Sequence, residues 1–83
     1  MFQVELSNRS EKELKRLDKI YQPKAAKYID LLRVNPFIGQ KMTGEFKDYY
    51  RIKIPPLRII YSLNLKDKVV RIKALGFRGG VYK

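Results

Sequence analysis

Three segments of alternating hydrophobicity in the second half of the chain constrain its fold more than any other feature. Strands are predicted at Tyr49–Ile54, Leu57–Leu63 and Lys68–Leu75. Successive side chains of a strand point to opposite faces, so this alternation indicates a sheet with one buried and one exposed face. Pro55-Pro56 separates the first two segments, and Asn64 to Asp67 separate the last two. Such short connections favour antiparallel hairpin pairing.

Two amphipathic helices are predicted ahead of these strands. Residues 2–6 alternate apolar and polar side chains and indicate a short first strand. Apolar residues then recur at helical spacing, which predicts a helix over about Arg9 to Ile20. A second helix is predicted to start near Pro23, which suits a first helical turn, and to end at Asn35-Pro36. The following residues, Phe37 to Asp48, are predicted to form a loop.

These elements predict an α+β fold with the order β-α-α-β-β-β. The helical hairpin is expected to pack on one face of a mainly antiparallel four-stranded sheet. Because 83 residues are too few for two stable cores, residues 1–83 are interpreted as a single domain. No apolar run reaches the ~18 residues of a membrane span, and the start lacks a basic region before an apolar stretch. We therefore expect a cytoplasmic protein with no membrane partner.

The residue types that are missing exclude several kinds of site. The chain contains no cysteine and no histidine, so disulfides, thiolate metal sites, the usual zinc sites and imidazole bases are ruled out. The carboxylates Asp30, Glu45, Asp48 and Asp67 are scattered along the sequence, which argues against a carboxylate metal cluster. We expect no metal and no cofactor. Any catalysis would have to use Lys, Arg, Tyr, Asp, Glu or a hydroxyl group.

Basic residues greatly outnumber acidic ones. Nineteen Lys and Arg against eight Asp and Glu give a formal net charge of +11, more than solubility requires of so small a domain. Residues 1–40 contribute +3 of this charge and residues 41–83 contribute +8. A charge of this size favours a polyanionic partner, with nucleic acid as the first candidate. The surface that meets this partner is expected to come mainly from the second half of the chain.

The sheet is predicted to carry one apolar face and one basic face. On the apolar face we expect Tyr50, Ile52, Ile54, Leu57, Ile59, Tyr61, Leu63, Val70, Ile72 and Ala74. On the opposite face we expect Arg51, Lys53, Arg58, Arg71 and Lys73, with no acidic residue among them. Because like charges on neighbouring strands repel, this concentration of cations favours a bound anion. The alternative is a set of ordinary solvated positions.

Residues near the C-terminus extend this basic face. Arg78 follows the last predicted strand and would lie at the rim of the face. Gly79-Gly80 permits the chain to fold back, so Tyr82 is a candidate ring on which an unpaired base stacks. The alternative for this tyrosine is packing on the core. The candidate nucleic-acid contacts are Lys41, Lys47, Arg71, Lys73 and Lys83.

Taken in order, these segments resemble the RelE/ParE superfamily of toxins from toxin–antitoxin systems. The resemblance spans nearly the whole chain and is carried by Asn35-Pro36-Phe37, Lys41-Met42-Thr43-Gly44, Tyr50-Arg51-Ile52-Lys53-Ile54, Leu57-Arg58-Ile59-Ile60-Tyr61, Gly76-Phe77-Arg78 and Val81-Tyr82. The chain departs from the family pattern at Phe77, where many relatives have histidine. It also departs at Thr43, where RelE proteins often carry a basic residue.

The resemblance implies one of two activities. The RelE branch consists of ribosome-dependent ribonucleases that cut mRNA in the decoding site, whereas the ParE branch poisons DNA gyrase. For the RelE branch it implies a metal-free attack of a ribose 2′-oxygen on its own phosphate, which leaves a cyclic phosphate. The positions that match the RelE catalytic set are Arg51, Lys53, Arg58, Arg78 and Tyr82. A third interpretation is a nuclease-inactive module that binds nucleic acid on the same scaffold.

The chemistry of these side chains agrees with the implied reaction. Arg58 and Arg78 would donate to the phosphate oxygens, and Lys53 would protonate the leaving oxygen. Tyr82 would stack the base and orient the 2′-hydroxyl, while Arg51 would stabilise charge or activate the nucleophile. The expected partners are the ribosome with mRNA in its decoding site and an acidic, partly disordered RelB-like antitoxin. We expect the toxin and antitoxin to form a hetero-oligomer.

Overall fold

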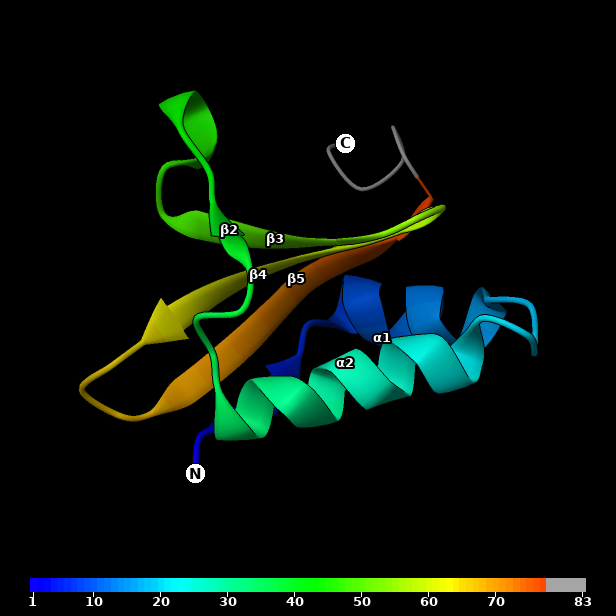
Figure 1. Cartoon of the computed structure of the whole chain (residues 1–83), viewed down its shortest axis with the longest axis horizontal. Coiled ribbons are helices and arrows are strands. Elements are labelled where there is room, and N and C mark those ends of the chain that lie inside the picture. Colours follow the sequence, from blue (N-terminus) through cyan, green and yellow to red (C-terminus); the bar gives the residue numbers. More distant parts are fainter. Residues whose placement is uncertain (78–83) are drawn as a thin grey trace.

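A computed structural model describes residues 1–77, and in this part of the chain two helices cover one face of a five-stranded sheet (Figure 1). The elements are β1 (Gln3–Leu6), α1 (Asn8–Arg16), α2 (Gln22–Val34), β2 (Gln40–Lys41), β3 (Tyr49–Ile54), β4 (Leu57–Asn64) and β5 (Val69–Phe77), with a 3-10 turn, η1, at Gly44–Phe46. The predicted α+β fold is confirmed. Neither α1 nor α2 is long and apolar enough to cross a membrane.

The sheet has one strand more than the sequence predicted. Within the expected loop, the two residues of β2 pair with β3 in the register Gln40↔Arg51 and Lys41↔Tyr50. So short a strand has no hydrophobic alternation of its own, and the backbone of β3 imposes its extended conformation. The strand order is β1-β5-β4-β3-β2, in which β1 is parallel to β5 and the other pairs are antiparallel.

The core lies between α2 and the sheet. Ala25, Ile29 and Leu32 follow one another at helical spacing along α2 and are buried, as the apolar stripe of an amphipathic helix requires. Helix α1 ends at Arg16, four residues before the predicted end at Ile20, whose side chain is exposed. The side-chain amide of Gln22 donates to the carbonyl of Leu17 at 2.9 Å and so satisfies a group that the helix leaves unpaired.

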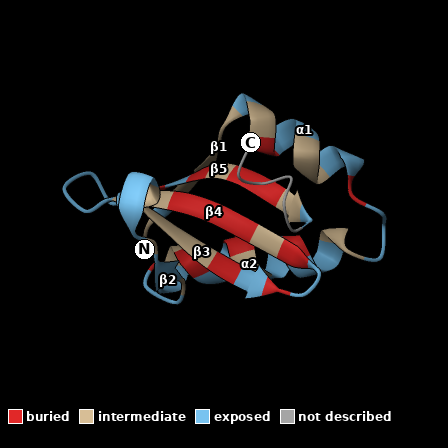
Figure 2. Ribbon diagram, turned by 90° about the horizontal axis from the view of Figure 1, so that it is seen from above, coloured by how far each residue is buried: buried red, intermediate tan, exposed pale blue. Residues whose placement is uncertain are grey.

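A β-bulge changes which side chains of β5 face the helices. Ile60 pairs with Ala74, but the next residue, Tyr61, pairs with Ile72, so Lys73 is an extra residue on β5. The prediction that Ala74 lies on the face covered by the helices is therefore wrong. It is buried against Ile60 on the opposite face, and Leu75 joins the main core in its place. Figure 2 shows the buried stretch of β4, which includes Ile59, Ile60 and Tyr61.

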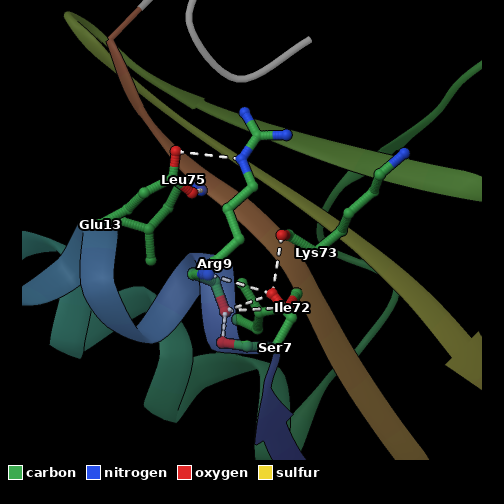
Figure 3. A network of polar contacts seen from close by, with 7 residues as sticks. Ser7, Arg9, Glu13, Ile72, Lys73 and Leu75 are labelled. Atoms are coloured by element: carbon green, nitrogen blue, oxygen red, sulfur yellow. Dashed lines mark hydrogen bonds and ion pairs between the residues drawn. The ribbon is translucent and has the colours of Figure 1, made fainter. Parts of the chain in front are cut away.

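The start of α1 holds the bulged part of β5 in place (Figure 3). Strand β1 ends where its partner residue is Ile72. From that point on, side chains of the N-cap residue Ser7 and of α1 bind backbone groups of β5. Ser7 Oγ donates to the carbonyl of Lys73 at 2.9 Å, and Ser10 Oγ donates to the carbonyl of Ile72 at 3.0 Å. The amide of Leu75 donates to Glu13 Oε1 at 3.1 Å. We call this set of contacts the clasp.

Candidate nucleic-acid interface

The face of the sheet opposite the helices, here called the open face, brings three of the predicted site residues together. Lys53 on β3 and Arg58 on β4 are direct cross-strand partners beside the Pro55-Pro56 turn. Directly opposed side chains have Cβ atoms ~4.5–5.5 Å apart. Arg51 lies two residues before Lys53 and therefore on the same face. These three side chains form one basic group at the turn end of the sheet.

A hollow of about 530 Å³ adjoins this basic group. Its lining residues are Lys53, Pro55, Pro56, Leu57, Arg58 and Phe77. The ring of Phe77 contacts the ring of Tyr21 edge-on, with centroids 5.5 Å apart. Three predicted site residues, Arg78, Tyr82 and Lys83, lie outside the described residues. The described wall of the hollow thus combines two cations with an apolar surface, which suits a ligand that has both an anionic and a ring component.

Arg51 carries a hydrogen-bond donor that has no partner among residues 1–77. Its Nη2 donates to Gln40 Oε1 at 3.4 Å, but its Nε is buried and unpaired in this part of the chain. A buried donor without an acceptor costs about 1–3 kcal/mol. Strand β2, which places Gln40 opposite Arg51, was missed in the sequence because it lacks alternation.

The hydroxyl of Tyr61 anchors the segment that leads into β2. It donates to the carbonyl of Pro36 at 2.8 Å and accepts from the amide of Gly39 at 3.0 Å. A Cβ atom at residue 39 would lie 2.8 Å from Tyr61 Cε1, so this approach requires glycine. The sequence predicted Tyr61 as a core residue. A tyrosine on a buried strand face implies a partner for its hydroxyl, but the pattern does not say which.

Burial of Tyr61 is expected to make the folded protein less stable at alkaline pH. Desolvation is the main cause that raises the pKa of Tyr61 to about 12 from 10.0. Between these values the unfolded chain releases this proton and the folded chain keeps it, so stability is full below pH 10 and falls as pH rises toward about 12. We expect this residue to lower the free energy of unfolding by up to about 1.4 kcal/mol per pH unit. Urea unfolding of the parental protein and Tyr61→Phe at several alkaline pH values measures the difference, and equal slopes would contradict it.

Four other predicted contacts are dispersed. Arg71 donates to Glu5 at 3.0 Å across β1 and β5, so the expectation of a basic face without a carboxylate is wrong. The parallel pairing of β1 beside β5, which produces this contact, was not visible in the sequence. Lys41 is the partner of the core-packed Tyr50 and therefore lies on the other face of the sheet. Lys47 is exposed just after η1, and Lys73 lies on the open face near two aromatic rings.

Comparisons with known sequences place the chain among toxins. The family model described as "ParE toxin of type II toxin-antitoxin system, parDE" matches residues 4–82. A protein of Methanocaldococcus jannaschii named as the toxin RelE1 is 30% identical over 87 residues, which cover 99% of this chain and 96% of the relative.

Solved structures show the same fold. A chain in the archaeal RelE–RelB complex from Pyrococcus horikoshii is 31% identical, with a TM-score of 0.76 and coverage of 94% of this chain and 96% of that one. A chain in the toxin–antitoxin complex RelBE2 from Mycobacterium tuberculosis has a TM-score of 0.86, with coverage of 93% and 98%. At 15% identity, this second likeness concerns the fold alone.

Proposed function

The chain belongs to the RelE/ParE superfamily of toxins from type II toxin–antitoxin systems, and from this premise we propose that it is a ribosome-dependent endoribonuclease that cuts mRNA in the decoding site. The observation that carries the proposal is the cross-strand pair of Lys53 and Arg58 beside the hollow. Arg51, two residues before Lys53 on β3, adds a third cation on the same face. A phosphate needs such an arrangement of fixed cations and donors.

The proposed reaction is an in-line transfer within the RNA itself. The ribose 2′-oxygen forms a bond to its own phosphorus, the bond from phosphorus to the 5′-oxygen breaks, and a cyclic phosphate remains. Arg58 would donate to the phosphate oxygens and stabilise the added negative charge. Lys53 would give a proton to the leaving 5′-oxygen. Arg51 would assist with charge, and Arg78 and Tyr82 complete the proposed set from outside the described residues.

This mechanism requires no metal ion. Among residues 1–77, no three Asp or Glu side chains gather closely enough to hold one. The proposal rests on the cations instead, because a guanidinium can neutralise the phosphate oxygens and an ammonium can transfer a proton.

Primer extension on a defined mRNA tests the proposal. The parental protein is expected to produce new 3′ ends inside the vacant decoding site of stalled ribosomes, and to produce none on the same mRNA without ribosomes. Arg58→Ala is expected to abolish these ends because it removes the forked phosphate donor. Arg16→Ala, an exposed arginine at the end of α1, is the matched control and should cut like the parental protein.

One observation favours a second candidate function. The matching family model is that of ParE toxins, and the ParE branch acts on DNA gyrase. If the parental protein cuts no mRNA in either condition but inhibits supercoiling by purified gyrase, the ribonuclease proposal is overturned and the gyrase proposal replaces it. Binding of RNA with neither activity would instead indicate a nuclease-inactive module.

We also propose that the protein binds a cognate acidic antitoxin and forms a hetero-oligomer with it. The net charge of +11 supports an acidic partner, and the structures of similar fold from Pyrococcus horikoshii and Mycobacterium tuberculosis are toxin–antitoxin complexes. Titration of the protein with the product of a neighbouring gene, followed by calorimetry, tests this. Absence of a complex at micromolar concentration would count against it.

A further inference from the structure

Two aromatic rings and an ammonium group meet on the open face, near the end of β3 at which Tyr49 lies. The ring centroids of Phe46 and Tyr49 are 6.5 Å apart with an angle of 63° between their planes. Lys73 Nζ lies 4.4 Å from the centroid of Tyr49 and 5.3 Å from that of Phe46. We call these three residues the aromatic corner. Figure 1 shows η1, which carries Phe46, on the side of the sheet away from the helices.

A small buried cluster on the open face supports the aromatic corner. Ile60 and Ala74 form a small buried cluster on this face, and Met42 and Tyr49 pack against it. Lys73 belongs to the corner because it is the extra residue of the bulge, and its carbonyl is bound by Ser7 in the clasp. The side chain of Lys73 is therefore positioned by the bulge and by Ser7, and the proposed cleavage reaction uses neither of them.

The surroundings of the corner favour an anionic ligand. Arg51 lies between the corner and Lys53 along β3. Of the carboxylates nearby, Glu5 is engaged by Arg71 at 3.0 Å, while Glu45 and Asp48, next to Phe46 and Tyr49 in the sequence, are exposed. Tyr49 and Lys53 are four residues apart, which places them ~13 Å apart along the strand. The cations therefore form a track from the hollow to the corner, along which a single strand of nucleic acid can lie.

We propose that Phe46, Tyr49 and Lys73 form a second RNA subsite, which binds an unpaired nucleotide next to the one that is cut. The base stacks on the aromatic rings, and its phosphate is bound by the ammonium of Lys73. Every base has a face that stacks on an aromatic ring, so this subsite fixes the position of the strand without selecting a sequence. The inference rests on the proposed function for the identity of the strand as mRNA.

Binding of an uncleavable RNA tests the subsite separately from catalysis. The probe is a short, fluorescently labelled single strand with 2′-O-methyl groups, and its affinity is measured by anisotropy over a range of salt concentrations. Phe46→Leu and Tyr49→Leu are each expected to weaken binding about tenfold with an unchanged salt dependence, because a π-face is lost and no charge. Lys73→Gln is expected to reduce the slope of log affinity against log salt by about 0.7, the value for one lost phosphate contact.

Two control variants carry the same types of substitution at positions away from the aromatic corner. Phe37→Leu alters an exposed ring after α2, and Lys27→Gln alters an exposed lysine on α2. Both should bind the probe like the parental protein, and circular dichroism should show all variants folded.

The possible outcomes separate the two proposals. Unchanged affinity in both leucine variants, an unchanged salt slope in Lys73→Gln, or no binding by the parental protein would overturn the subsite. Weakened binding of an acidic antitoxin peptide with unchanged RNA binding would also overturn it and make the corner a protein contact. If the variants lose RNA affinity as expected while the parental protein cuts no mRNA, the corner stands as a binding site for an unpaired nucleotide and the ribonuclease proposal fails.

Discussion

Replacing Lys53 by alanine is expected to slow mRNA cleavage by about 10²–10⁴-fold, which is the usual effect of removing a general acid. The side chain is exposed at the end of β3 and contributes little to the core. The loss should therefore appear in the rate of cutting, while the free energy of unfolding changes by less than about 0.5 kcal/mol. Single-turnover cleavage on stalled ribosomes measures the rate constant, and urea unfolding measures the stability.

A second substitution at the same residue separates charge from proton transfer. Lys53→Arg keeps the positive charge opposite Arg58, but a guanidinium does not give up its proton in proteins. If Lys53 is the proton donor, the arginine variant stays nearly as slow as the alanine variant. If Lys53 acts through its charge alone, arginine restores most of the activity and the assigned role is wrong. Lys27→Ala on α2 is the control.

Truncation of Leu32 is expected to have the largest effect on stability. Its side chain is fully buried between α2 and the sheet, and replacement of such a leucine by alanine costs about 2–5 kcal/mol through lost burial and the cavity left behind. That is a large share of the 5–15 kcal/mol that typically separates folded from unfolded states. Urea unfolding monitored by circular dichroism gives the difference.

The neighbouring leucine provides the matched control. Leu31 belongs to the same helix and differs by one position, but its side chain is 41% exposed. Leu31→Ala removes the same atoms from a site where water already reaches them, so we expect a cost below about 1 kcal/mol. Equal losses for the two variants would show that α2 does not pack on the sheet through the face described.

The periodic parts of this fold could be predicted from the sequence, since a strand or helix with one buried face carries the matching repeat. The strand segments and the basic side chains of β3 and β4 are of this kind, and so Lys53 and Arg58 were expected on one face. Ala74 was placed on the wrong face because one extra residue shifts the register, and the alternation of β5 gives no sign of it. The bulge is visible only once β4 is beside β5.

Pairing between strands that are distant in the sequence was the second feature that could not be predicted. The contact between Glu5 and Arg71 joins strands at opposite ends of the described chain, and no local pattern reveals which strand becomes the neighbour of which. The anchoring of the β2 segment by Tyr61 is hidden for the same reason. Predicted residues at the C-terminal end, Arg78, Tyr82 and Lys83, stay predictions.

The clasp also affects when this protein can fold during its own synthesis. Ser7 and Ser10 bind backbone groups that lie 66 and 62 residues further along the chain. Contacts of such high sequence separation cannot form until the distant segment has been synthesised. Because β5 is made last, β1 and α1 leave the ribosome before the strand with which they pair. The open face consequently cannot be completed on a nascent chain that ends before β5.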